Sequence, residues 1–137
     1  MEVGKIKQTD PDRRFRRVLS ASTLEGDRVV NPAGEDLGKV RDLAIDLTSG
    51  RVAYLVLSYG GVLGIGDKLF AVPWRAVRID EEEKAFVLDI DKRRLELAPG
   101  FDKDHWPDMA DPAWSADIER FYTIPGSDVR SFGGGAD

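Results

Sequence analysis

The sequence predicts a mainly β protein: a small antiparallel β-barrel of about six strands, followed by a short C-terminal helical extension. The main observation is that glycine turns divide residues 34–74 into three strand-like stretches. Apolar residues alternate through Leu43, Ile45 and Leu47, and then occupy nearly every position from 52 to 57. A half-buried strand followed by one that is apolar on both faces is typical of a closed or nearly closed barrel. Because a barrel this small is filled by its own side chains, we expect function at its rim, its outer face or its tails.

Composition favours one domain with tails. The chain has 137 residues, an ordinary size for a single domain. It contains no cysteine, which excludes disulfides, thiolate metal ligands and cysteine nucleophiles. No apolar run approaches the roughly 20 residues of a membrane helix, and the N-terminus lacks a signal-peptide pattern. These features predict a cytoplasmic protein without membrane insertion.

The net charge of −5 is unevenly distributed. Residues 1–20 carry six basic and three acidic side chains, whereas residues 80–119 carry five basic and thirteen acidic ones. Nucleic-acid binding usually requires a basic face, so this distribution argues against a nucleic-acid partner. The N-terminal arginines have two interpretations: a solvated arm that offsets the acidic body, or an arm for RNA or anionic lipid in which Phe15 inserts. They are Arg13, Arg14, Arg16 and Arg17.

The elements of the barrel follow in chain order. Residues 1–17 are expected to form a flexible basic leader, and Ser22 to cap a short turn with Glu25 in a capping box. Trp74 lies in a Pro-Trp corner and is expected to close one end of the barrel. Turns that contain glycine or proline separate the first five strands, and the charged stretch 81–84 separates the last two. The expected strands are 27–30, 38–47, 51–59, 68–72, 77–79 and 85–90.

The glycine-rich stretch at residues 60–67 is predicted to be a hairpin tip. Its four glycines have neither the dinucleotide-binding nor the P-loop spacing, and a strand rather than a helix follows them. Three apolar residues are unusual at such a tip, and we expect them to meet a partner chain. They are Val62, Leu63 and Ile65.

The C-terminal part is predicted to be helical. Residues 91–97 have helical spacing, and a second helix at 112–122 begins with Asp111 as N-cap and Pro112 at its first position. This helix carries one apolar stripe. The stripe either folds back onto the outer wall of the barrel or docks another chain, and both hold if the helix packs across a dimer. It consists of Trp114, Ile118, Phe121 and Tyr122.

The aspartate-rich segment around His105, the only histidine, is the one candidate for chemistry. A metal site would use His105 with Asp102, Asp104 and Asp108. The third ligand position of a calcium loop holds Trp106 instead, and a transition-metal site usually has more than one imidazole. The favoured interpretation is a structured linker in which His105 and Trp106 pack on the barrel. With no nucleophile elbow or triad, we predict no catalytic residue, no metal ligand and no cofactor.

Several segments together resemble the PRC-barrel family over Val18–Ile90. The resemblance implies a small, strongly bent antiparallel barrel of about six strands that performs no chemistry and binds protein neighbours. The family includes the cytoplasmic domain of the H subunit of purple-bacterial photosynthetic reaction centres and the C-terminal domain of a ribosome maturation factor. This sequence looks like the stand-alone bacterial members, and its stretch 101–109 looks like an extension found in some of them. The segments are Leu37–Leu43, Ile45-Asp46, Gly50–Tyr54, Gly60-Gly61, Gly64–Gly66 and Phe70–Trp74.

These observations give a domain division and three hypotheses. We expect a leader at 1–17, the barrel at 18–90, a helical extension at 91–124 and a disordered tail at 125–137. The leading hypothesis is a non-catalytic protein-interaction module, homodimeric, that uses the loop apolar residues, Trp106 and the helical stripe. The alternatives are an accessory factor in ribosome or RNA metabolism acting through the arginine arm, and a small enzyme centred on Asp104 and His105.

Overall fold

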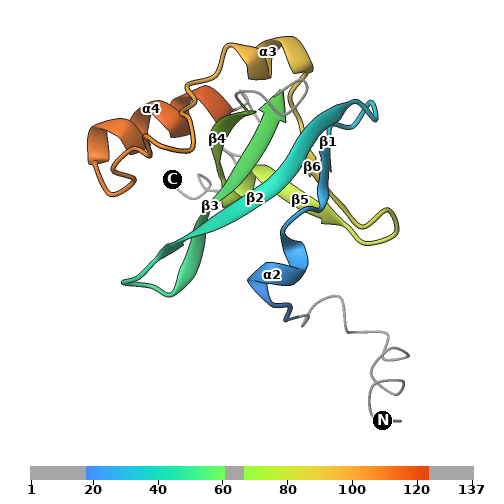
Figure 1. Ribbon diagram of the computed structural model, residues 1–137, viewed down its shortest axis with the longest axis horizontal. Coiled ribbons are helices and arrows are strands. Elements are labelled where there is room, and N and C mark those ends of the chain that lie inside the picture. The colour runs from blue at the N-terminus through green and yellow to red at the C-terminus, as the bar shows by residue number, and fades with distance from the viewer. Residues whose placement is uncertain (1–17, 61–66, 124–137) are drawn as a thin grey trace, which may run out of the picture.

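The computed structural model describes residues 18–60 and 67–123. A six-stranded sheet, in the order β4-β3-β2-β1-β6-β5, curls into a half-barrel (Figure 1). The predicted mainly β fold and the six strands are therefore confirmed. The strands are β1 (Arg28–Val30), β2 (Asp36–Asp46), β3 (Arg51–Gly60), β4 (Asp67–Pro73), β5 (Val77–Asp80) and β6 (Ala85–Leu88).

One strand pair corrects the prediction of a purely antiparallel barrel. β1 lies parallel to β6, with Val29 opposite Phe86, whereas the other four pairs are antiparallel. Each of those four joins strands that are consecutive in the chain, three of them by short turns that set the antiparallel direction. β1 and β6 are far apart in sequence and meet only because the sheet curls. The local pattern of residues therefore carries no signal for their direction.

β2 is the strand that bends the sheet. Its pairing with β3 shifts register between Val40 and Asp42 and again between Ala44 and Ile45. Such irregularities bend a strand and increase its twist. Gly38 lies where β2 approaches β3 closely: its φ is +123°, and a Cβ there would lie 2.1 Å from the Ser58 carbonyl oxygen. Only glycine fits this position, so it permits the close approach of the two strands.

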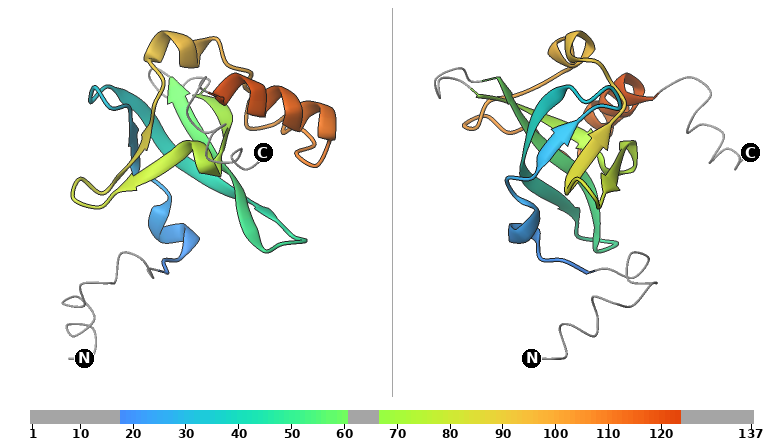
Figure 2. Two further views of the ribbon diagram at one scale, coloured as in Figure 1. Left: turned by 180° about the vertical axis from the view of Figure 1, so that it is seen from behind. Right: turned by 90° about the vertical axis from the view of Figure 1, so that its right-hand side faces the viewer.

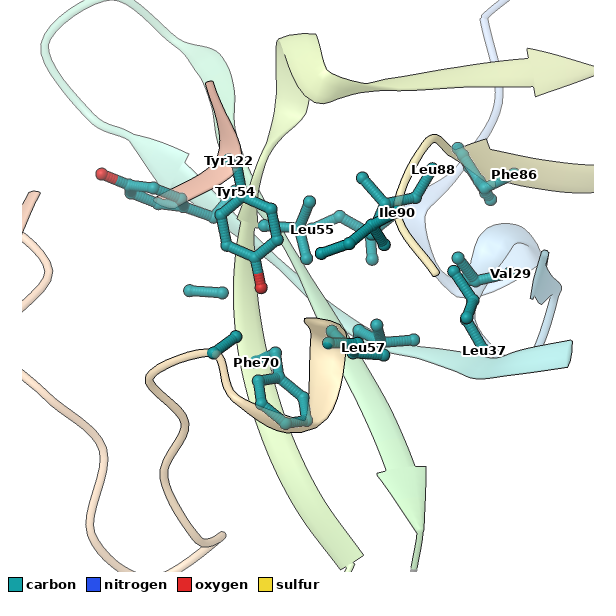
Figure 3. Close-up of a cluster of buried hydrophobic side chains, with 14 of the residues drawn as sticks. Val29, Leu37, Tyr54, Leu55, Leu57, Phe70, Phe86, Leu88, Ile90 and Tyr122 are labelled. Carbon is teal, nitrogen blue, oxygen red and sulfur yellow. The ribbon is translucent and has the colours of Figure 1, made fainter. Parts of the chain in front are cut away.

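The core fills the inside of the curl, with further apolar residues on the outer face of β3 (Figure 3). In β3, Tyr54–Leu57 are four consecutive buried residues, as the apolar run predicts. Successive side chains of a strand point to opposite faces. Tyr54 contacts Trp114 of the C-terminal helix, with ring centroids 5.2 Å apart, so one face of β3 meets this helix. The opposite face presents Leu55 and Leu57 to the barrel core.

Short helices cover the sheet at two places. Figure 2 shows α3 and α4 at one end of the molecule and α2 at the other. Asp91 caps α3 by accepting from the Arg94 N–H, and Asp111 caps α4 by accepting from the Ala113 N–H, as predicted for α4. The helices are α2 (Ala21–Leu24), the 3-10 turn η3 (Trp74–Ala76), α3 (Lys92–Glu96) and α4 (Pro112–Tyr122).

The predicted cap of the first helix is wrong. Ser20, not Ser22, is the N-cap of α2: its Oγ accepts from the Thr23 N–H at 3.2 Å. The helix has only one turn, because the N–H of Gly26 donates to the Val40 carbonyl and draws the chain into the sheet. The start of the helix therefore lies earlier than the capping box implies.

Candidate interaction site

α4 packs against the chain's own sheet. Ile118 is 1% exposed and Tyr122 is 7% exposed, and both belong to the core. Trp114 and Phe121 are half-buried and pack against the same core. In this structure the helix therefore folds back onto the sheet of the barrel. Ile118 and Tyr122 are buried in this internal contact, and a role of the stripe in docking a partner stays a prediction.

Hydrogen bonds hold α3 between the sheet and α4. The hydroxyl of Tyr59 donates to Glu96 Oε2 at 2.7 Å. This hydrogen bond, aided by burial, raises the pKa of Tyr59 above its ordinary value. Arg94 donates to the Phe121 carbonyl oxygen at 2.7 Å, and its guanidinium lies 4.4 Å from the Phe121 ring centroid. These groups fix the helical extension in place.

The segment after α3 forms a structured linker. Phe101 bridges to Leu69 of β4 through two backbone hydrogen bonds of 2.8 Å. Trp106 packs on the Phe101 ring at 5.1 Å and donates to the Lys103 carbonyl, while 43% of its surface stays exposed. Trp106 thus packs on the linker itself rather than on the strands of the barrel, and His105 remains exposed.

Asp102 and His105 lie in a hydrogen-bonded turn on the surface. His105 Nδ1 lies 2.8 Å from Asp102 Oδ1, which also accepts from the Asp104 N–H. The His105 hydrogen bond lowers the pKa of Asp102 below its ordinary value. Across residues 18–60 and 67–123, no group of three histidine, cysteine or carboxylate side chains is placed to hold a metal ion. What the structure shows here is a capped turn on the surface.

Two sets of predicted contact residues lie outside the described part of the chain. They are the loop residues Val62, Leu63 and Ile65, and the arm residues Arg13, Arg14, Arg16 and Arg17. Their roles stay predictions.

An apolar groove that the sequence did not reveal opens at the α2 end of the half-barrel. It has a volume of about 440 Å³ and is bounded by α2, the β2–β3 hairpin, η3 and β5. Seven large apolar side chains are exposed among the described residues, and four of them line this groove. Those four are Val18, Leu19, Ile45 and Ile79. We call this feature the seam groove; its other lining residues are Ala21, Leu24, Leu43, Val52, Trp74 and Glu81.

The seam groove exists because the barrel does not close on itself. Ile79 lies opposite Phe86 in the β5–β6 pair, and paired residues share one face of a sheet. Phe86 is buried and packs on Trp74, so Ile79 also points toward the interior. It is nevertheless 50% exposed, because β5 is the last strand of the sheet. In the sequence, only the alternation of apolar residues in β5 pointed to Ile79. The residues that line the groove with Ile79 lie on other parts of the chain.

The irregular register of β2 supplies the opposite wall. The alternation of Leu43, Ile45 and Leu47 predicts three residues on one buried face. Leu43 is half-buried as expected, but Ile45 is 46% exposed and Leu47 is 90% exposed. The register shift between Ala44 and Ile45 ends the regular alternation at this point. Apolar side chains predicted to be internal therefore lie at the rim.

A second depression lies beside the seam groove, and two of its charged side chains form an ion pair. It has a volume of about 610 Å³ and contains Arg75 and Glu119, which form an ion pair between η3 and α4. Val52 and Trp74 line both depressions. The charged pair thus anchors α4 next to the apolar seam groove.

A filled core and an apolar groove at the rim define a small β-barrel domain. Comparison with known families identifies this domain: a model of the PRC-barrel domain matches residues 16–95. The chain therefore belongs to the PRC-barrel domain family, as the sequence resemblance predicted. The family is in general non-catalytic. A comparison with curated proteins finds none that matches this chain.

The described helices were compared with the length and apolar character of a membrane-spanning helix. Within 18–60 and 67–123, no helix combines the length and the apolar character needed to cross a bilayer.

Proposed function

We propose that this chain is a non-catalytic protein-interaction module that acts as a homodimer. The observation that carries the proposal is the seam groove, which gathers Val18, Leu19, Ile45 and Ile79 into one exposed apolar surface. Contiguous apolar surface of this kind marks contact sites in soluble proteins. Covering it removes apolar area from water, at about 25 cal/mol for each Å² buried.

The lining of the seam groove supports contact with protein rather than catalysis. Glu81 is its only ionisable side chain. A site for chemistry needs several convergent polar groups, with one group placed to orient another. The seam groove offers aliphatic side chains and the Trp74 ring instead. Association with another apolar surface is the role that fits this lining.

The other functions considered from the sequence receive less support. A role in ribosome or RNA metabolism depends on Arg13–Arg17, which lie outside the described residues. An enzyme centred on Asp104 and His105 would act from an exposed turn, where His105 engages Asp102. The cytoplasmic location stays a prediction from composition.

Sedimentation velocity over micromolar to near-millimolar protein concentrations tests the proposal. The wild type is expected to show a monomer–dimer equilibrium. Ile45→Asp places a charge in the seam groove and should shift that equilibrium to monomer, since a charge cannot be buried without a partner. Leu97→Asp is the matched control, because Leu97 is 79% exposed and does not line the groove. A wild type that stays monomeric throughout, or equal effects of both substitutions, overturns the proposal.

A further inference from the structure

β5 is the end of the sheet that the described residues leave uncovered. At the other end, Phe101 bridges to Leu69 and occupies part of the edge of β4. β5 pairs with β6 alone within 18–60 and 67–123. An edge strand presents a row of N–H and C=O groups, which is a template for another strand.

The four residues of β5 complement themselves when two copies run antiparallel. We infer that a second copy of this chain docks here, pairing β5 with β5 of the partner subunit about a twofold axis at Ile79. This inference rests on the proposed homodimer and names its surface. The register sets Ile79 opposite Ile79 of the partner subunit, and Arg78 opposite Asp80 of the partner subunit.

Charge selects this register over its neighbours. Directly opposed residues on antiparallel strands have Cβ atoms about 4.5–5.5 Å apart, so opposite charges attract and like charges repel. With the axis at Ile79, the twofold symmetry produces the Arg78–Asp80 pairing twice. Moving the axis by one residue sets two arginines against each other in one direction and two aspartates in the other. The sequence of β5 therefore specifies one isologous pairing.

Arg78 and Asp80 are available for this pairing. Arg78 is exposed and makes no ion pair with any described residue. Asp80 Oδ1 accepts from the N–H groups of Glu82 and Glu83 at 3.1 and 3.2 Å, which orients the carboxylate at the end of the strand. Oδ2 has no hydrogen-bond partner within the described segments and can meet a guanidinium.

The same docking covers the seam groove. Ile79 lines the groove, and its side chain points to the face opposite to Arg78 and Asp80. Strand pairing about Ile79 thus brings the two seam grooves together on one face, with the ion pairs on the other. Backbone pairing, apolar burial and charge all favour the same contact.

A charge-reversal and mixing experiment tests the inference. Arg78→Glu sets an acidic side chain against Asp80 of the partner subunit twice, and it should raise the dimer dissociation constant at least about tenfold. Asp80→Lys sets a lysine against Arg78 of the partner subunit and should weaken self-association similarly. Mixing the two variants restores both attractions, because the introduced glutamate faces the introduced lysine and the native aspartate faces the native arginine. We therefore expect a heterodimer with near wild-type affinity, measured by sedimentation of one labelled variant.

Controls separate this inference from the proposed function. Arg93→Glu reverses an exposed charge on α3 and should leave the dimer unchanged. Ile79→Asp gives a second disruption at the axis if Asp80→Lys alters its turn, and circular dichroism reports whether each variant folds. A wild-type dimer that is insensitive to both Arg78→Glu and Ile79→Asp, or folded variants that do not associate on mixing, overturns the β5 contact while the homodimer stands. A wild type that stays monomeric overturns both the β5 contact and the proposed homodimer.

Discussion

The two edge strands of the half-barrel differ in how far the chain itself covers them. β4 is held by the chain itself: Phe101 bridges to Leu69, and α4 buries Ile118 and Tyr122 in the core beside it. β5 pairs on one side only among the described residues, and Ile79 is half exposed. The same sheet therefore has a covered end and an open end.

This difference separates stability from association. An edge covered by its own chain contributes to the free energy of folding, whereas an exposed apolar edge contributes only when a partner covers it. Substitutions at the covered end should therefore lower the stability of the monomer. Substitutions at the open end should leave the monomer intact and act on the dimer.

The largest expected effect is at the covered end. Ile118→Ala should lower the free energy of unfolding by about 3 kcal/mol, because it leaves a cavity under α4 where the native side chain is 1% exposed. Ile79→Ala, the matched change at the open end, should cost the monomer less than about 1 kcal/mol. Urea denaturation at low protein concentration measures both values. Equal costs would mean that the two ends are not distinct.

Gly100 offers a second way to break the covered end. A Cβ at Gly100 would lie 2.9 Å from the Leu69 carbonyl oxygen, which accepts the hydrogen bond from Phe101. It would also lie 2.7 Å from Cε of Lys68, but that flexible side chain can move. Gly100→Ala should therefore destabilise the protein by about 2 kcal/mol through overpacking.

Hydrogen exchange locates the effect of Gly100→Ala. The amides of Leu69 and Phe101 form the bridge, so their exchange should accelerate more than that of residues in β1 and β6. Uniform acceleration throughout the sheet would indicate global destabilisation without a local break.

The covered end was largely predictable from the sequence. Pro112 after Asp111 is a strong start signal, and the run in β3 is long enough to demand cover on both faces. The apolar stripe of α4 left two interpretations, because periodicity shows that a face is buried and not what buries it. Only the packing of Ile118 and Tyr122 on the chain's own sheet decides between them.

The open end was not predictable in the same way. Leu19, Ile45 and Ile79 come from three segments far apart in sequence, and they meet because β2 bends and the sheet curls. The parallel β1–β6 pair, which brings β5 to this position, has no turn signature. Local patterns specify strands, whereas the seam groove depends on how the strands associate.

Tyr122 provides a further test of packing at the covered end. Its hydroxyl is buried and has no hydrogen-bond partner among the described residues, and burial raises its pKa well above the ordinary value. A buried polar group without a partner is destabilising, so Tyr122→Phe should raise the free energy of unfolding by about 1 kcal/mol. Tyr54→Phe is the matched control: the Tyr54 hydroxyl lies 3.1 Å from Ser115 Oγ, and losing that bond should lower stability by about 1 kcal/mol. Chemical denaturation of both variants decides, and a loss of stability in Tyr122→Phe would contradict the assignment.

The smallest expected effect concerns the turn that follows Phe101. The hydrogen bond from His105 lowers the pKa of Asp102 below its ordinary value of 3.8. A carboxylate with a lowered pKa in the folded state contributes stability above its unfolded pKa and loses it as the pH falls through the folded value. The melting temperature of the wild type should therefore exceed that of Asp102→Asn slightly near neutral pH, and the difference should vanish in strong acid. Because both side chains are exposed, the shift should be small, and a difference that grows on acidification would show that Asp102 does not support the covered end through its charge.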